Sequence, residues 1–259
     1  MCGLARSSLM GMDMRSLADS RRSAIPLERL PVPEVIAVVE PFTAARPEEV
    51  EALAAASVRL RKTSGTVLVE EGTAAEGIYI VLRGRVNLVR EGAGRDLILS
   101  SLGPGDVIGA SCAFDNTPMS TSAVTATPSE LLYIPADVVA AHVSRHPETL
   151  VRLMRLMSTK LRDIENVASS LALHDVEERL RRTLVRLAQR QGRRSPQSSS
   201  WILAPVPTQS ELARMVGSCR ETVSRTLSAM ARNGLVSSSG RRMILDERLV
   251  SGGNEASAA

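Results

Sequence analysis

Three polar side chains suited to reading DNA bases lie close together near residue 220. If this stretch is helical, Arg220, Glu221 and Arg225 share one outer face near the start of the helix. Arginine can bond O6 and N7 of guanine with both arms of its guanidinium group, and glutamate can accept a hydrogen bond from N4 of cytosine. An ordinary surface helix of mixed charge is the alternative, but the surrounding string favours base reading in a major groove.

The residues around this trio predict two helices joined by a tight turn. Thr208 and Glu211 form a capping box that begins the first helix, and Gly217 ends it because glycine tolerates a positive φ. Ser218 and Glu221 are predicted to form a second capping box that begins the second helix. Each helix has an apolar stripe at helical spacing, namely Leu212, Met215 and Val216 in the first and Val223, Leu227 and Met230 in the second.

Together these residues resemble a known DNA-binding motif. The string Gly217-x-x-Arg220-Glu221-Thr222-Val223-x-Arg225-x-Leu227 is similar to the helix-turn-helix of the CRP/FNR (catabolite activator / fumarate-nitrate regulator) family. The resemblance implies that Arg220, Glu221 and Arg225 read bases of a palindrome related to TGTGA-N6-TCACA. The family usually has serine directly before the arginine, where this chain has Cys219.

Further residues are predicted to contact the DNA backbone. The resemblance implies phosphate contacts at the start of the first helix. Beyond the second helix, residues 235–245 are predicted to form a two-stranded wing whose turn carries two arginines. The predicted backbone contacts are Thr208, Gln209, Ser218, Ser224, Arg241 and Arg242.

The charge distribution supports a polyanionic partner for the C-terminal region. The chain has 32 basic and 28 acidic residues and a net charge of +4, and residues 175–250 hold 14 arginines against 7 acids. This excess fits double-stranded DNA, although a solubilising surface is the alternative. Aromatic residues make up only 2% of the chain, so stacking on single-stranded bases is not expected.

Composition and motifs argue against several other classes of protein. No P-loop, G-x-S-x-G or H-E-x-x-H string occurs, so we expect no enzyme, no catalytic residue and no cofactor. The three cysteines are far apart and form no C-x-x-C pair, so neither a zinc site nor a disulfide framework is expected, and no histidine has metal-ligand spacing with a cysteine. The residues concerned are Cys2, Cys112, Cys219, His142, His146 and His174. No membrane-spanning apolar run or signal peptide is present, which predicts a cytoplasmic protein of a prokaryote.

Residues 58–135 have the pattern of a small antiparallel β-structure. Short alternating segments follow one another closely and are separated by glycines, which is typical of a sandwich or barrel. Leu82-Arg83-Gly84 and the stretch 102–109, Leu-Gly-x-Gly-Asp-x-Ile-Gly, are similar to the cyclic-nucleotide-binding jelly roll of the same family. The predicted fold class is α+β, with this antiparallel jelly roll, a long dimerisation helix and a C-terminal winged helix-turn-helix.

The pocket implied by this jelly roll lacks the groups that bind cyclic AMP in relatives. There a glutamate binds the ribose and an arginine-serine pair binds the cyclic phosphate, whereas the matching positions here are Ala110 and Ser120-Thr121. A buried phosphate without a cationic partner is costly, so cyclic AMP in its usual pose is not expected. The pocket either has no ligand, holds a weaker anion at backbone N–H groups, or takes another ligand such as a cyclic dinucleotide. The degenerate pocket comprises Gly109, Ala110, Ser111, Ser120 and Thr121.

A long helix beginning at Pro147 carries a two-stripe heptad pattern, which predicts a dimer seam. The alternative is a helix packed on its own barrel, and the family resemblance implies both roles at once. In cyclic-AMP-binding relatives a threonine-serine pair of this helix contacts the adenine, whereas Ile164 and Glu165 stand here. The predicted dimerisation residues are Leu150, Met154, Met157, Leu161, Ile164, Ala168 and Leu171.

The sequence therefore predicts a homodimeric transcription regulator, activator or repressor, that binds a palindromic promoter site. Control is expected either through a ligand in the barrel or through the amount of a constitutively active protein. Oxidation of Cys219 at a helix N-terminus is a third route, although an inert side chain is the simpler interpretation. The resemblance also implies contact with RNA polymerase, for which residues 193–200 form a candidate loop. The predicted parts are a mobile arm at 1–40, a β-barrel sensor domain at 41–146, a dimerisation helix and hinge at 147–173, a DNA-binding domain at 174–250 and a loose tail at 251–259.

Overall fold

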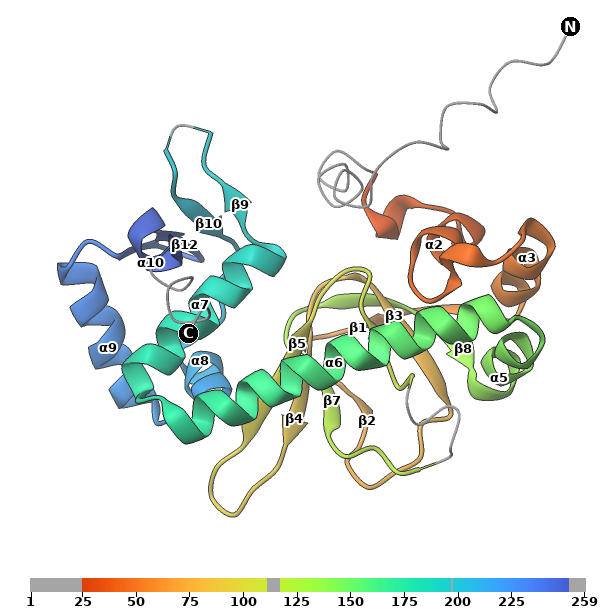
Figure 1. Cartoon of the computed structure of the whole chain (residues 1–259), viewed down its shortest axis with the longest axis horizontal. Helices are drawn as coiled ribbons and strands as arrows, with labels where there is room; N and C mark the ends of the chain where they lie inside the picture. The colour runs from red at the N-terminus through yellow and green to blue at the C-terminus, as the bar shows by residue number, and fades with distance from the viewer. Residues whose placement is uncertain (1–24, 111–116, 197, 252–259) are drawn as a thin grey trace, which may run out of the picture.

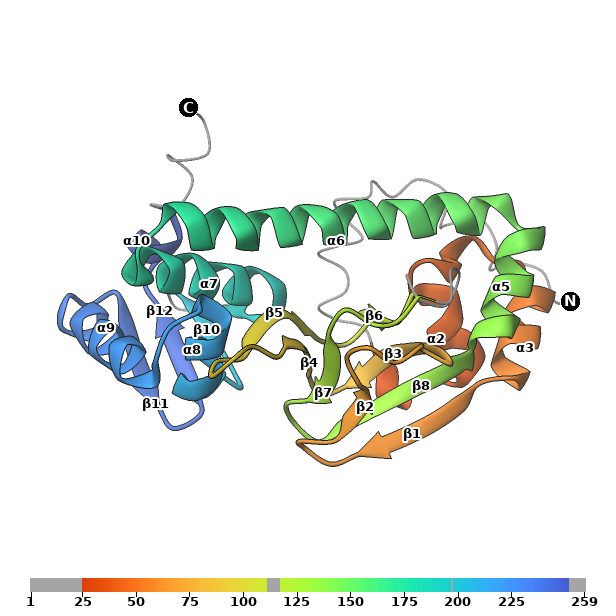
Figure 2. The same ribbon diagram turned by 90° about the horizontal axis from the view of Figure 1, so that it is seen from below.

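The computed structural model describes residues 25–110, 117–196 and 198–251, which form three parts (Figure 1). A β-barrel with helices at one end is the N-terminal part, and a smaller unit of helices and strands is the C-terminal part. One long helix, α6 (Pro147–Leu173), begins at the predicted proline and runs past both. Seen from below, α6 lies along one side of the molecule, over the barrel and over α7 (Val176–Gln191) (Figure 2).

The barrel consists of two four-stranded antiparallel sheets with strand orders β1-β8-β3-β6 and β2-β7-β4-β5, which confirms the predicted fold. Successive side chains of a strand point to opposite faces. In β3, therefore, Ile78 and Ile80 pack against the N-terminal helices, and Val81 packs between the two sheets. The strands are β1 (Val58–Lys62), β2 (Val67–Val69), β3 (Gly77–Arg83), β4 (Val86–Arg90), β5 (Leu97–Leu102), β6 (Val107–Ile108), β7 (Ser122–Thr125) and β8 (Ser129–Pro135).

The segment 25–40 differs from the mobile arm predicted for residues 1–40. Its helix α2 (Val32–Val38) buries Val35 and Ile36 completely in the core of the N-terminal part. The prolines do prevent a long helix here, but Pro33 lies in the first turn of α2, where proline is well tolerated. The other elements of this layer are η1 (Leu27–Arg29), η2 (Phe42–Ala44), α3 (Pro47–Ala55) and α5 (Ala136–Arg145). Residues 1–24 and 252–259 lie outside the described residues, so the predicted arm and tail are not tested there.

The C-terminal unit packs α7 and three further helices against a four-stranded sheet of order β11-β12-β10-β9. β11 (Val236–Ser239) and β12 (Arg242–Leu245) form the predicted wing. The prediction of a loop at residues 193–200 is wrong for its first two residues, because β9 (Arg193–Arg194) pairs with β10 (Trp201–Leu203). The Arg194 Cζ lies 5.4 Å from the centroid of the Trp201 ring. The remaining helices are α8 (Gln209–Val216), α9 (Arg220–Arg232) and α10 (Glu247–Ser251).

The helix α6 has one buried and one exposed apolar face. Leu153 and Val167 are buried, whereas the stripe predicted to form a dimer seam is mostly exposed in the single chain. The exposed fractions are 43% for Leu150, 63% for Met154, 58% for Leu161 and 51% for Ile164. Met157 packs against the barrel core, so it serves the protomer as well. Among the described residues, no helix combines the length and apolarity needed to span a membrane.

Candidate nucleic-acid interface

The first helix of the predicted pair begins and ends as its sequence indicates. The Thr208 Oγ1 accepts a hydrogen bond from the Glu211 N–H at 3.2 Å, and the Glu211 carboxylate accepts one from the Thr208 N–H at 2.8 Å. This reciprocal capping box satisfies two of the free N–H groups at the start of α8. Gly217 ends the helix with a φ of 60° and a ψ of 45°, the left-handed conformation that favours glycine. The left-handed conformation of Gly217 produces the tight turn before α9.

The second capping box was predicted at the wrong residue. The N-cap of α9 is Cys219, not Ser218, and no side chain caps this end. Ser218 belongs to the turn instead, where its N–H donates to the Ala213 carbonyl at 2.9 Å. The Cys219 thiol lies 3.1 Å from the Thr222 hydroxyl, and this hydrogen bond lowers the pKa of the thiol. Cys219 is exposed, so it is accessible at the start of the helix.

The helix α9 presents the three predicted base-reading residues on its outer side. Val223 and Met230 are buried in the core of the C-terminal unit, and this orientation leaves Arg220, Glu221 and Arg225 exposed. A hydrogen bond from its own backbone N–H lowers the pKa of Glu221, so the carboxylate is ionised and can only accept hydrogen bonds. The outer side carries an open groove of about 560 Å³ lined by Gln209, Arg220, Glu221, Ser224, Arg225, Ser228 and Arg232. This set is called the recognition groove below.

The recognition groove brings together five of the predicted residues and adds two that sequence reasoning missed. Ser228 lies four residues after Ser224 and Arg232 lies seven after Arg225, so helical spacing alone was enough to find both. Arg241 and Arg242 do not line the groove. They are exposed at the turn of the wing, where Gly240 has a φ of 58°.

The barrel holds a separate cavity of about 290 Å³ against α6. Gly109, Ala110, Ser120 and Thr121 line it as predicted, while Ser111 lies outside the described residues. Its other lining residues are Leu88, Leu99, Ser100, Ile108, Met119, Met157, Lys160, Leu161, Asp163 and Ile164. Sequence reasoning missed Lys160, whose ammonium group donates to the Val107 carbonyl at 2.8 Å and whose pKa is lowered by burial.

A buried ion pair joins the barrel to the helix-turn-helix. Arg85 directly precedes β4, and its Nη2 lies 2.8 Å from the Glu211 Oε1 of α8. The two side chains are only 7% and 11% exposed. Burial alone raises the pKa of Glu211, but the hydrogen bond from the Thr208 N–H and the charge of Arg85 outweigh it and hold the pKa below its ordinary value. Glu211, which completes the capping box of α8, therefore also attaches this helix to the barrel, whose strand β5 lies beside α8 (Figure 2).

Comparisons with known proteins match both halves of the chain. The family described as cyclic nucleotide-binding domain matches residues 59–146, and the Crp-like helix-turn-helix domain matches residues 178–249. The CRP-like cAMP-activated global transcriptional regulator of Mycobacterium tuberculosis is 28% identical over 215 residues, which cover 83% of this chain and 95% of that protein. The Cyclic AMP receptor protein of Thermus thermophilus is 30% identical over 198 residues, 75% of this chain and 87% of that one.

A solved structure shows the same arrangement. The c-di-GMP responsive global regulator CLP of Xanthomonas campestris is 28% identical with a TM-score of 0.65, over 78% of this chain and 99% of that chain. A cyclic-nucleotide-binding-type barrel followed by a winged helix-turn-helix defines a transcription regulator that binds DNA. The chain belongs to the CRP/FNR family, as its sequence motifs predicted.

Proposed function

We propose that this chain regulates transcription as a homodimer that binds a palindromic DNA site without cyclic AMP in the usual pose. The exposed groups Arg220, Glu221 and Arg225 of the recognition groove carry this proposal. The exposed apolar stripe of α6 supports pairing of two copies. A two-fold dimer of this kind places two recognition helices in successive major grooves, about 34 Å apart along the duplex.

A gel-shift titration tests the proposal directly. Purified full-length protein is titrated against a palindrome related to TGTGA-N6-TCACA, the same probe with one half-site scrambled, and a fully scrambled probe. We expect one retarded complex containing two chains on the palindrome and weaker binding to the half-site probe. Equal affinity for all three probes at physiological salt would refute sequence-specific binding by a dimer.

Replacing Arg220 with alanine should remove the reading of one base pair in each half-site. We expect a loss of about 1–3 kcal/mol on the best site and a relaxed preference at that position, because the bidentate contact to guanine disappears. The measurement is a set of affinities for probes that carry each of the four base pairs at every position.

Arg241→Ala is the matched control, since Arg241 is an exposed arginine of the wing that lies outside the recognition groove. It should weaken all probes by a similar factor and flatten the salt dependence of binding, as expected for a phosphate contact. Uniform weakening by Arg220→Ala as well would argue that Arg220 contacts only phosphates.

Ligand gating is the second candidate for control, and the cavity between the barrel and α6 favours it. Leu161 and Ile164 line that cavity and also belong to the exposed stripe of α6. A ligand there would contact residues of the proposed dimer seam, and so bias how the two chains pair. A relative is named as responsive to c-di-GMP, which makes cyclic dinucleotides the first ligands to try.

A thermal-shift screen separates constitutive binding from ligand gating. We expect no stabilisation by cyclic AMP, because Ala110 offers no ribose acceptor and Ser120 offers no positive charge at the predicted positions. A ligand at 100 times its Kd should stabilise the folded chain by about 2.7 kcal/mol. A shift with cyclic di-GMP that is lost in Ile164→Trp, which fills the cavity, would place a ligand there, and a change in affinity for the palindrome with the same ligand would establish gating. No shift with any nucleotide would support constitutive DNA binding.

RNA polymerase is proposed as a further partner, through residues 193–200. The β9–β10 hairpin projects away from the rest of the C-terminal unit (Figure 1), and Arg193 and Arg194 are exposed on it. An exposed basic hairpin outside the recognition groove is free to contact a second protein while α9 contacts DNA.

A further inference from the structure

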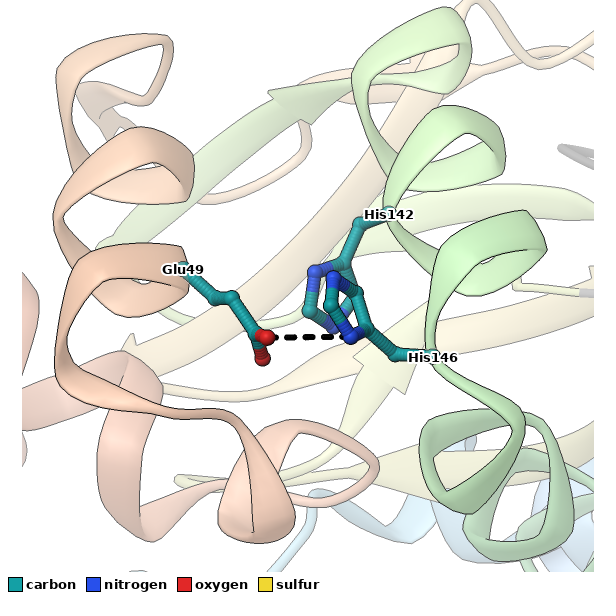
Figure 3. A group of neighbouring side chains, drawn as sticks. All are labelled: Glu49, His142 and His146. Atoms are coloured by element: carbon teal, nitrogen blue, oxygen red, sulfur yellow. Dashed lines mark ion pairs between the residues drawn. The ribbon is translucent and has the colours of Figure 1, made fainter.

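Three ionisable side chains converge far from the recognition groove, where the N-terminal helices meet α5. Glu49 comes from α3, His142 lies in α5, and His146 forms the C-cap of α5 (Figure 3). A ligand-type atom of each residue lies within 4.8 Å of those of the other two. Because residues four apart lie on the same side of a helix, α5 presents both imidazoles toward the carboxylate. We call these residues the Glu-His-His cluster.

The cluster is shielded from solvent and held in place. Glu49 and His142 are each 8% exposed, and the His146 side chain is 14% exposed. The Nδ1 of His146 lies 2.9 Å from the Glu49 Oε1, and the Nε2 of His142 lies 3.1 Å from the Thr149 hydroxyl.

Two imidazole nitrogens and one carboxylate oxygen are the protein ligands of one common class of zinc site, which keeps its fourth position for water. Ligand atoms around tetrahedral zinc lie roughly 3.3 Å apart, given bond lengths of about 2.0–2.2 Å. Small side-chain rotations are therefore enough to turn the present arrangement into a coordination shell. We propose that the Glu-His-His cluster binds a divalent transition-metal ion of the zinc class, with water as the fourth ligand.

The residue that competes with a metal for Glu49 is Arg46. Its guanidinium Nη2 lies 2.6 Å from the Glu49 Oε1, and its backbone N–H donates to the Oε2 at 2.9 Å. The Arg46 side chain is 63% exposed, so it can turn toward solvent while its backbone N–H still orients the carboxylate. Such outer hydrogen bonds are the usual support of metal ligands.

The position of the cluster gives a bound metal a structural consequence. His146 is both the C-cap of α5 and the N-cap of α6, and the exposed stripe of α6 begins four residues later at Leu150. A metal would tie α3 to the first turn of α6, at the opposite end of the helix from the DNA-binding unit (Figure 2). Metal occupancy would therefore stabilise the end of α6 that leads into the proposed dimer seam.

Cobalt(II) absorption of the full-length, tag-free protein tests the site. After treatment with a chelator, one equivalent of Co²⁺ should give the intense visible bands of tetrahedral cobalt, without the charge-transfer band of a thiolate. One equivalent of Zn²⁺ should abolish these bands and raise the Tm. His146→Gln and Glu49→Gln should each lower the zinc affinity by roughly 100-fold or more, since loss of a mere outer partner costs 10–100-fold.

His174→Gln is the matched control, because His174 is the one histidine of the chain outside the cluster. It should bind Co²⁺ and Zn²⁺ like the unchanged protein, and circular dichroism of every variant should match that of the unchanged protein. Absence of tetrahedral cobalt bands would overturn the proposal, and so would zinc affinity that is equal in His146→Gln, Glu49→Gln and His174→Gln. A thiolate band would place the metal at a cysteine instead and refute this site equally.

Discussion

Ile164→Glu in the exposed stripe of α6 is expected to weaken binding to a palindromic operator by roughly 100- to 10,000-fold, the factor that bivalent attachment contributes. Ile164 is 51% exposed in the single chain, so a carboxylate there stays hydrated and the protomer keeps its fold. In a two-fold seam of parallel helices, each seam residue faces its own copy. Two carboxylates would then meet in a dry interface, where an unpaired charge is strongly destabilising.

Sedimentation and gel-shift measurements on the same preparation check this result. Ile164→Glu should sediment as a monomer and bind a palindrome no better than a single half-site. Asn166→Glu is the matched control, because this exposed residue lies about 200° further round the helix and introduces the same charge. A dimeric Ile164→Glu protein with undiminished affinity would show that the two chains pair through some other surface.

The parts of the fold that sequence reasoning predicted correctly have strong local signals. Gly217 adopts the left-handed conformation that its position after α8 predicted, and the Thr208–Glu211 capping box is present. Alternation and glycine spacing likewise predicted the strands of the barrel. The helix α2 was missed because its seven residues are too few for a periodic pattern. Its burial depends on partners such as Phe42 and Leu53, which no local signal reveals.

The same distinction separates the predicted and the missed parts of the candidate site. The recognition groove was predictable because the buried stripe of α9 fixes which residues face outward. The Arg85–Glu211 pair joins residues 126 positions apart, and no sequence pattern links them. His142 and His146 do have the spacing of helical metal ligands, but the carboxylate of Glu49 comes from another helix, and only the fold brings it there.

The second large effect is expected at the pair that joins the barrel to the helix-turn-helix. Arg85→Ala leaves the Glu211 carboxylate buried with its charge only partly compensated, and breaking a buried pair in this way costs about 3–5 kcal/mol. Urea unfolding followed by fluorescence of Trp201, the one tryptophan of the chain, measures the loss in the C-terminal unit. Arg90→Ala, at the last residue of β4, is the matched control. The side chains of the Arg90–Glu71 ion pair are 54% and 27% exposed. Losing this pair should therefore lower the free energy of unfolding by only about 0–1 kcal/mol.

The pH dependence identifies Glu211 as the source of the effect. Its pKa in the folded chain lies below the ordinary 4.5, so its interactions stabilise the fold fully above that pH. This stabilisation is lost as the pH falls through the lower folded value. Without Arg85 the folded pKa rises toward the ordinary 4.5, so the unfolding free energy that is lost on acidification below pH 4.5 should be smaller than in the unchanged protein. An equal loss of unfolding free energy in the two proteins over that pH range would contradict this assignment.

Removing both charges should restore most of the stability that Arg85→Ala loses. The pair is incompletely satisfied, because the Arg85 Nε and the Asn87 Oδ1 are buried without a hydrogen-bond partner among the described residues. Exchanging such a pair for uncharged groups of similar size is often neutral or stabilising, and glutamine at residue 211 preserves the capping box. The double variant Arg85→Met, Glu211→Gln should therefore unfold near the urea midpoint of the unchanged protein. Because the pair also fixes α8 against the barrel, DNA affinity that changes in the double variant at unchanged stability would show that this contact sets the orientation of the recognition helix.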